Sequence, residues 1–239
     1  MDHPSFSQRQ TLPSLKITKE CLVSLESYLV GWVVDNRISV EEEAAKSLSL
    51  EIEDKHGVET FSSMSQVPFS RFHDSTSRIQ ILMKKPYTGD GAELRVKLDF
   101  SGRPRFSELR IDATMPNAKD RALALKGGLL RLLEQQKTQN WMAHPNSVFS
   151  TILYLTVLLI SFFHVQGTGN PMISLFLLVI SALVLVYLFA VPKLRKYTVF
   201  DSPAADKADD RWKWLIRAIA SFLLFTLSLP WLINRLSGS

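Results

Sequence analysis

The chain has 239 residues and a formal net charge of +5, and it contains one cysteine, Cys21. A single cysteine excludes an intrachain disulfide and a cysteine-based metal site. The length allows one soluble domain of ordinary size together with a membrane part.

Residues 1–14 are polar and contain two prolines, so we expect them to form a flexible tail. They include no apolar stretch of the kind that a secretory signal peptide needs. The domain that follows is therefore expected to stay in the cytosol.

Apolar residues recur three and four positions apart between Cys21 and Val33, which predicts an amphipathic helix over residues 18–34. Thr18 is the expected N-cap of this helix. Cys21 has apolar neighbours, which favours a buried thiol over a nucleophile. The capping-box pattern that starts at Ser39 indicates a short helix or turn.

Alternating apolar and polar residues predict a meander of about five strands between residues 48 and 113. The clearest strand is 94–100, in which every second residue is apolar and the residues between them are charged. The connections are short, so we expect antiparallel pairing. With its flanking helices, the domain is predicted to be an α+β fold.

A second helix is expected from Asn117 to Trp141, with one leucine-rich face. Gly127 and Gly128 weaken its middle by about 1 kcal/mol each. Close packing against the sheet is one explanation for this pair. The other is a kink or hinge that transmits movement of the sheet.

Two apolar runs follow, 18 residues over Val148–Val165 and 20 residues over Met172–Val191. Because a bilayer core about 30 Å thick requires roughly 20 apolar residues, both runs are predicted to be transmembrane helices. The alternative is a helical hairpin buried in a soluble core. A third apolar stretch, Trp214–Ile233, contains Arg217 and is predicted to span as well, or else to lie in the membrane interface.

The cations just after the second run, Lys193, Arg195 and Lys196, place residues 192–213 in the cytosol by the positive-inside rule. The expected organisation is thus a flexible tail (1–14), a cytosolic α+β domain (15–145) and a transmembrane domain (146–239) with spans over 148–165, 172–191 and 214–233. The predicted localisation is multi-pass in a membrane, with a bacterial inner membrane as the favoured one.

Charge is distributed unevenly within the α+β domain. Residues 1–77 carry 7 basic and 12 acidic residues, whereas residues 78–131 carry 12 basic and 6 acidic ones. Such a split indicates either a basic ligand face or two halves that attract each other. The candidate ligand-binding residues are the cations of one hairpin, with Phe100 and Phe106 beside its turn: Arg95, Lys97, Arg103, Arg105 and Arg110. A solvated sheet face, or contact with anionic lipid, is the alternative.

A search for catalytic patterns finds no phosphate-binding glycine loop, no HExxH, no CxxC pair and no GxSxG. His73 and Asp74 form a weak acid–base pair that an exposed polar turn explains better. We therefore predict no catalytic residues, no metal site and no cofactor.

Polar residues repeat along single faces of the three apolar segments, which predicts that these faces turn inward. Ordinary helix–helix contact explains such stripes, and the functional alternative is a water-filled path in an oligomer. The stripe residues are Ser150, Tyr154, Ser161, His164, Ser174, Ser181, Arg217, Ser221 and Ser228.

This layout, a cytosolic domain followed by a few apolar helices, resembles the small membrane effectors of bacterial antiphage defence. The resemblance implies a homo-oligomeric effector in the lipid bilayer. Its cytosolic domain would sense a nucleotide, an oligonucleotide or a partner protein and gate a pore. The helix over 117–141 would couple the two parts.

Two other functions remain open from the sequence. One is a passive membrane anchor or scaffold that recruits a cytosolic partner protein. The other is an enzyme of lipid or envelope metabolism, for which the only candidate pair is His73 and Asp74.

Overall fold

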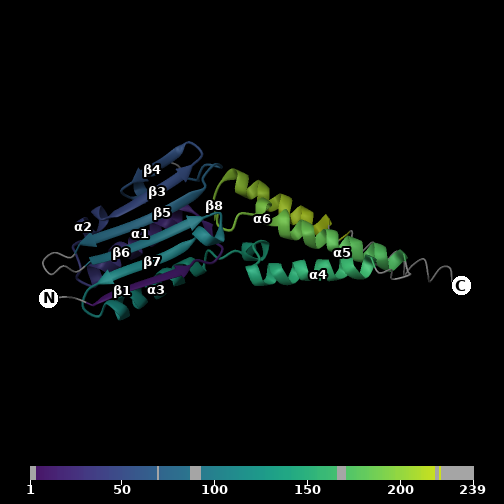
Figure 1. Cartoon of the computed structure of the whole chain (residues 1–239). Helices are drawn as coiled ribbons and strands as arrows, with labels where there is room; N and C mark the ends of the chain where they lie inside the picture. Colours follow the sequence, from purple (N-terminus) through teal and green to yellow (C-terminus); the bar gives the residue numbers. More distant parts are fainter. Residues whose placement is uncertain (1–3, 69, 87–92, 166–170, 219–220, 222–239) are drawn as a thin grey trace.

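The computed structural model describes residues 4–68, 70–86, 93–165, 171–218 and 221. It has two parts: a β-sheet with helices on one face, and a group of helices that extends from one end of the sheet (Figure 1). The first part confirms the predicted α+β domain, and the second part requires corrections that are given below.

The sheet has six antiparallel strands in the order β1-β7-β6-β5-β3-β4. The predicted meander accounts for five of them, and the sixth is an edge strand from the segment expected to be a flexible tail. The strands are β1 (Ser5–Thr11), β3 (Leu48–Asp54), β4 (Gly57–Phe61), β5 (Arg78–Pro86), β6 (Glu93–Ser101) and β7 (Glu108–Thr114).

The core lies between the sheet and two long helices, α1 (Lys19–Asp35) and α3 (Ala118–Glu134). Thr18 caps α1 as predicted, because its hydroxyl accepts a hydrogen bond of 3.1 Å from the amide of Cys21. Cys21 is buried, and this burial raises the pKa of its thiol to about 11, as expected for a core residue.

Short helices connect these elements. They are α2 (Glu41–Lys46), η1 (Met64–Gln66), η2 (Pro104–Phe106) and η3 (Gln139–Ala143). The predicted helix over residues 117–141 is therefore two elements, because α3 ends at Glu134 and η3 begins five residues later.

The two glycines of α3 have different surroundings. A Cβ atom on Gly127 would meet nothing within 4 Å, whereas one on Gly128 would lie 1.7 Å from Tyr28 Oη. Gly128 is thus the point at which α3 packs closely against the Tyr28 side chain of α1. Close packing therefore explains Gly128, as one of the two alternatives proposed. The packing partner is helix α1, whereas the sequence suggested the sheet.

The second part begins with two apolar helices, α4 (Ser147–Val165) and α5 (Pro171–Phe189), which form an antiparallel hairpin (Figure 1). The rings of Tyr154 and Phe189 meet edge to face at 5.8 Å between centroids, and Val157 is buried. The short helix α6 (Val191–Leu194) and a helix over residues 203–218 follow.

Between α6 and the last helix, the chain returns to the α+β domain. We call residues 195–202 the return segment. Its strand β8 (Val199–Phe200) pairs in parallel with β2 (Lys16–Ile17), and Tyr197 Oη donates a hydrogen bond of 3.0 Å to the carbonyl of Leu12. Thr198 is fully buried. The return segment is therefore part of the domain core, although more than 180 residues separate the paired strands in the sequence.

The base of the hairpin is held by polar contacts of Arg195 and His144. The guanidinium of Arg195 donates to Asn140 Oδ1 at 2.7 Å and to Asp209 at 2.9 Å, and it lies 5.4 Å from the ring of Trp212. His144 Nε2 donates to the carbonyl of Arg195 at 2.6 Å. Burial lowers the pKa of His144, so the neutral imidazole is favoured in this packed junction.

The predicted transmembrane domain is not found. In the part of the chain that the structure describes, no helix combines the length and the hydropathy needed to cross a lipid bilayer. The expected spans over 148–165 and 172–191, the multi-pass membrane localisation and the channel or pore interpretation are therefore wrong. The physical reason is that an apolar run predicts a helix that needs cover from water, but hydropathy does not identify what covers it.

The alternative of a buried hairpin is not observed either, because large apolar side chains of α4 and α5 are exposed. The third apolar stretch falls mostly outside the described residues, which end in this region at 218 and 221. Residues 192–213, which follow the second apolar run, form most of α6, the return segment and most of the last helix.

Candidate functional site

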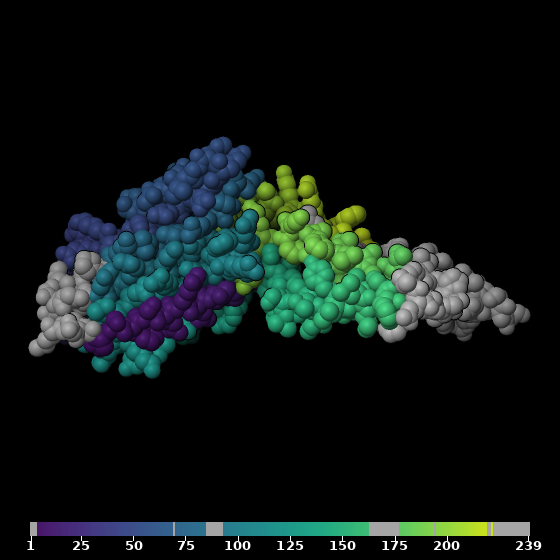
Figure 2. Space-filling model, in the orientation of Figure 1, coloured from purple at the N-terminus to yellow at the C-terminus, as the bar shows by residue number. Residues whose placement is uncertain are grey.

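The face of the sheet that α1 and α3 leave uncovered is dominated by charged side chains, and we call it the outer sheet face. Figure 1 shows this face toward the viewer, and Figure 2 shows its surface. Every second residue of the strands points to it, because side chains alternate along a strand. Its charged residues are six cations, Arg9, Arg78, Lys84, Arg95, Lys97 and Arg110, and six carboxylates, Glu51, Glu53, Glu93, Asp99, Glu108 and Asp112.

The strand register gathers five of these cations into one band. Arg9 lies opposite Arg110, and Arg110 lies opposite Lys97, so three cations follow one another across β1, β7 and β6. Arg95 and Lys84 form a second pair of opposed cations, one step along β6 and β5. Like charges opposite each other are unfavourable. The basic band therefore concentrates positive charge that the rest of the face must offset.

A band of carboxylates lies beside the basic band, toward the end of the sheet from which the helices extend. Glu108 faces Asp99 directly, and Glu51 continues the same row beyond Gln80. In the next row Glu53 faces Arg78. The two charge-biased halves of the sequence thus meet within one sheet, because acidic β3 pairs with β5, and β5 pairs with basic β6.

Two ion pairs connect the two bands, because Arg9 pairs with Glu108 and Lys97 Nζ lies 3.5 Å from Asp99 Oδ2. The other two lie outside the acidic band: Arg110 Nε is 2.8 Å from Asp112 Oδ2, and Arg95 pairs with Glu93 at 3.1 Å. Asp112 faces Arg95 across the strands, and Glu93 lies beyond the basic band. The side chains of Arg9, Arg95 and Arg110 are between 46% and 70% exposed, so each of their pairs contributes at most about 1 kcal/mol.

Asp99 is the buried exception, with a side chain that is 4% exposed. Arg78 donates to both of its carboxylate oxygens, and the Nε–Oδ1 distance is 2.8 Å. This hydrogen bond to Asp99 is the largest cause that raises the pKa of Arg78 above its usual range. The Arg78–Asp99 pair therefore holds a fixed charge arrangement at the junction of β5 and β6.

The structure separates the five predicted ligand-binding cations into two groups. Arg95, Lys97 and Arg110 lie on the outer sheet face, as their alternation predicted. Arg103 and Arg105 are exposed on the turn around η2, at the end of the β6–β7 hairpin. Of the two expected aromatic neighbours, Phe100 is buried in the core and Phe106 is 54% exposed.

The predicted polar stripe of the apolar helices is only partly described. Ser150 is half-buried, Ser161 donates to the carbonyl of Val157 at 2.8 Å, and Ser181 Oγ is buried without a hydrogen-bond partner in the described part. Arg217 and Ser221 are exposed. Ser228 and the side chains of His164 and Ser174 lie outside the described residues. Tyr154, which contacts Phe189, fits the helix–helix interpretation of this stripe.

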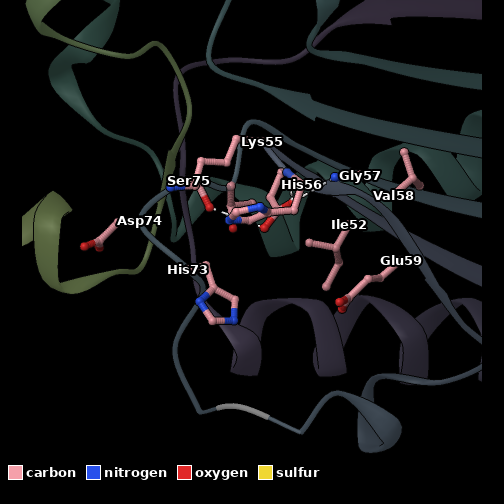
Figure 3. A pocket seen from close by; sticks show the side chains of 11 residues that line it. Ile52, Lys55, His56, Gly57, Val58, Glu59, His73, Asp74 and Ser75 are labelled. Carbon is pink, nitrogen blue, oxygen red and sulfur yellow. Dashed lines mark hydrogen bonds between the residues drawn. The ribbon is translucent and has the colours of Figure 1, made fainter.

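A cavity of about 540 Å³ lies at the β3–β4 turn, near the weak acid–base candidates (Figure 3). Asp54 serves the turn itself: its Oδ1 accepts from the amides of His56 at 2.7 Å and Gly57 at 3.1 Å. The first of these bonds is the largest cause that lowers the pKa of Asp54. Gly57 has φ of +148°, a backbone conformation that favours glycine in such a turn.

Asp74 lines the cavity, but its carboxylate points away from it in Figure 3. It accepts a hydrogen bond of 2.8 Å from the amide of Ala204, at the start of the helix over 203–218, and this bond is the largest cause that lowers its pKa. Asp74 is therefore held as a cap of that helix, with its carboxylate directed away from the cavity that His73 also lines. Within the described ranges, no cluster of three or more His, Cys, Asp or Glu side chains is placed to hold a metal ion.

The acidic half of the outer sheet face was not predicted from the sequence. The alternation in β3 indicated that Glu51 and Glu53 point outward, but only the strand order shows that they lie next to β5.

No protein family, no curated protein and no solved structure matches the chain in the comparisons with known proteins.

Proposed function

We propose that the chain is a non-catalytic recognition protein whose outer sheet face binds a partner protein with a complementary charge pattern. The observation that supports this proposal is the division of that face into a basic band and an acidic band. Complementary potentials steer association and select partners more than they increase affinity. A divided face favours a partner that carries both signs of charge in register.

A nucleic acid fits this face less well than a protein. A polyphosphate chain requires an excess of cations, because its affinity comes from phosphate neutralisation. The outer sheet face instead carries six cations and six carboxylates. Sheets that bind single strands also stack bases on aromatic side chains, and none of the described outward residues of this face is Phe, Tyr or Trp.

The ion pairs on the face are compatible with exchange during binding. Arg9 has a side chain that is 70% exposed, and Arg95 and Arg110 are about half exposed. Since an exposed pair contributes little to stability, a partner that supplies its own carboxylates to the basic band replaces these contacts at low cost. The buried Arg78–Asp99 pair would keep the strand positions fixed during that exchange.

The test is charge reversal on the basic band with a matched control. The double variant Arg95→Glu and Arg110→Glu inverts the centre of the band. The control Lys55→Glu and Lys119→Glu makes the same change in net charge at exposed positions, on the β3–β4 turn and at the start of α3. Partners are recovered by lysine-reactive cross-linking in extracts, and contacts are mapped by mass spectrometry to Lys84 and Lys97.

We expect the band variant to weaken the recovered interaction at least about tenfold, equal to roughly 1.4 kcal/mol, while the control leaves it unchanged. Reversing the charge of a partner carboxylate that lies next to a cross-linked lysine of the partner should restore binding to the band variant. Binding that survives the reversal would refute the proposal. So would tight, strongly salt-dependent binding of a 20-nucleotide single strand, because it would identify the face as a phosphate-binding surface.

A further inference from the structure

Strand β1 forms one edge of the sheet, at its lower border in Figure 1, and it lacks the features that commonly keep an edge from pairing. It is seven residues long, contains no proline and pairs with β7 in an unbroken register. The opposite edge strand, β4, has five residues and carries Glu59 on the inner side of the sheet, opposite buried Ile52. Short edge strands and inward-pointing charges prevent edge-to-edge association. Strand β1 is therefore the edge better suited to accept a further strand.

The backbone of β1 directs alternate residues toward β7 and toward the free edge. The amide of Leu12 donates to the carbonyl of Ser107 at 2.9 Å, and these two residues continue the register of β1 with β7. Because the direction of hydrogen bonding alternates along an antiparallel strand, the even-numbered residues of β1 bond to β7. The odd-numbered residues direct their amides and carbonyls to the free edge, where no described strand lies. These residues are Ser5, Ser7, Arg9 and Thr11.

A buried polar atom without a partner lies in the middle of this edge strand. Gln8 is opposite buried Ile111 and therefore points to the inner side of the sheet. Its side-chain oxygen Oε1 is buried and has no hydrogen-bond partner among the described residues. Such an atom costs about 1–3 kcal/mol unless a donor reaches it. The Gln8 side chain as a whole is only partly buried, so its amide group can turn to a donor that a further strand brings.

A second copy of β1 fits this edge in an antiparallel register with a two-fold axis at Gln8. Backbone hydrogen bonds form only if odd-numbered residues meet odd-numbered residues, and this axis satisfies that condition over the whole strand. Ser7 then meets Arg9 of the second copy, and Ser5 meets Thr11. The two Gln8 residues meet each other at the axis.

The neighbouring registers are less favourable. An axis at Arg9 places two guanidinium groups opposite each other and brings Pro13, which has no amide hydrogen, opposite Ser5. An axis at Ser7 leaves Thr11 opposite residue 3, which precedes the strand. The axis at Gln8 is therefore the one that uses all seven residues without opposing like charges.

This register gives each Gln8 the partner that it lacks. Side chains that meet at a position without backbone hydrogen bonds have Cβ atoms about 4.5–5.5 Å apart, so the NH2 group of each Gln8 can donate to Oε1 of the other. The odd-numbered residues of the two copies add about eight backbone hydrogen bonds. A typical protein interface contains about ten direct hydrogen bonds. Because the paired edges bury little apolar surface, we expect a reversible dimer.

The charges near the edge are compatible with this pairing. Arg9 lies opposite Ser7 of the second copy, and the Ser7 hydroxyl donates to Asp112 in its own chain. The basic band of one copy thus leads to a carboxylate of the other. The two Arg9 side chains lie diagonally, about 7–8 Å apart. Each is paired with Glu108 of its own chain, which offsets their repulsion.

We propose that two copies of this chain pair through the free edges of β1, antiparallel about Gln8, so that their sheets form one continuous sheet. The two outer sheet faces then lie side by side. This inference concerns the edge of the sheet and goes beyond the partner site proposed for its face, and either can hold without the other.

The first test measures the mass of the purified full chain by sedimentation equilibrium over a range of concentrations. The wild type should be a reversible dimer. Ser7→Lys places a cation opposite Arg9 of the second copy and should raise the dimer dissociation constant at least about tenfold. The control Thr60→Lys makes the same charge change at an exposed outward position of the other edge strand, β4, and should leave the constant unchanged.

The second test uses disulfide formation and reports the register. Gln8→Cys should form a disulfide-linked dimer under mild oxidation, because the two copies of this residue meet at the axis. The control Gln10→Cys lies on the same side of the same strand, but its two copies would be about 13 Å apart along the strands and should not link. The one natural cysteine, Cys21, is buried and has a raised pKa, so it provides little background.

A wild-type chain that stays monomeric overturns the proposal, and so does equal cross-linking by the two cysteine variants. A dimer that Ser7→Lys does not weaken also overturns it, because association then uses another surface, such as the exposed apolar side chains of α4 and α5. Hydrogen exchange gives a further outcome that overturns it: slow exchange of the Ser7 and Arg9 amides only in the presence of cell extract. In that case a strand of another protein occupies the edge.

Discussion

Replacing the adjacent glycines of α3 by alanine should change stability in opposite directions. Either substitution removes a helix-weakening residue and, by helix propensity alone, stabilises the fold by about 1 kcal/mol. The new Cβ of Gly127→Ala meets nothing within 4 Å, so this variant should keep the full gain. The new Cβ of Gly128→Ala would lie 1.7 Å from Oη, 2.3 Å from Cζ and 3.0 Å from Cε2 of Tyr28.

Carbon atoms pack at about 3.5–4.0 Å, so the Gly128→Ala variant requires Tyr28 or α1 to move. Overpacking of this kind costs about 1–3 kcal/mol. Because the helix-propensity term is common to both variants, the free energy of unfolding of Gly128→Ala should be lower than that of Gly127→Ala by the same 1–3 kcal/mol.

Urea unfolding followed by circular dichroism at 222 nm measures this difference, provided that the denaturant slope is equal for both variants. Both substitutions are then repeated in a Tyr28→Ala background, where the overlap is absent. The difference between them should shrink to within about 0.5 kcal/mol, the usual limit for sites that do not interact. Equal stability of the two variants with Tyr28 present would refute the packing explanation.

Three further substitutions test contacts of the α+β domain. Ser107→Ala removes the buried hydroxyl that accepts from the Ser101 amide at 3.0 Å, and the orphaned amide should lower the free energy of unfolding by about 1–3 kcal/mol in urea titrations. Asp99→Asn breaks the ion pair with Arg78 and should lower the free energy of unfolding by about 1–3 kcal/mol. This loss is smaller than for a fully buried pair, because the Arg78 side chain is 39% exposed. Asp74 has a folded-state pKa below its ordinary value of 3.8, so its contribution is present above pH 3.8 and is lost as the pH falls through the folded-state pKa. The protection factors of the first-turn amides of the helix over 203–218, taken relative to intrinsic exchange at each pH, should therefore fall at acid pH in the wild type. The variant Asp74→Ala, which removes the acceptor, should show low protection at neutral pH already.

The sheet was predictable wherever its side chains alternate. Leu94, Val96 and Leu98 are each at most 1% exposed, and the charged residues between them point outward as expected. Strand β1 was not predictable, because SFSQRQT contains one large apolar residue and becomes a strand through its pairing with β7. Local propensity carries no information about such pairing.

The candidate site was predictable in part for the same reason. Arg95, Lys97 and Arg110 were expected to share a face, because they occupy outward positions of neighbouring strands. The position of Glu51 beside that face depends on β3 pairing with β5, and Asp74 acts on a helix that begins 129 residues later in the chain. Both contacts join residues that are far apart in the chain, so local sequence patterns do not predict them.

The apolar runs show a different limit. Their composition correctly predicted helices over most of 148–165 and 172–191. Composition alone does not identify the surroundings of an apolar helix, and the prediction that both helices span a membrane was wrong. The return segment was not predicted to be part of the α+β domain. Its strand β8 has only two residues and is followed by the polar residues around Ala204, so no local pattern indicates that it pairs with β2.

The parallel pairing of Ile17 with Phe200 makes the helical hairpin an insertion within the α+β domain, where the sequence suggested an appendage after it. During synthesis, the ribosome must finish both hairpin helices before β8 can cover Leu15 and Ile17, which are fully buried in the finished fold. Until then the nascent domain lacks Phe200 from its apolar core, an incomplete state that is prone to aggregation. A fragment cut at residue 145 would therefore lack β8 permanently, whereas a variant with the hairpin deleted and the return segment joined directly to η3 would keep it.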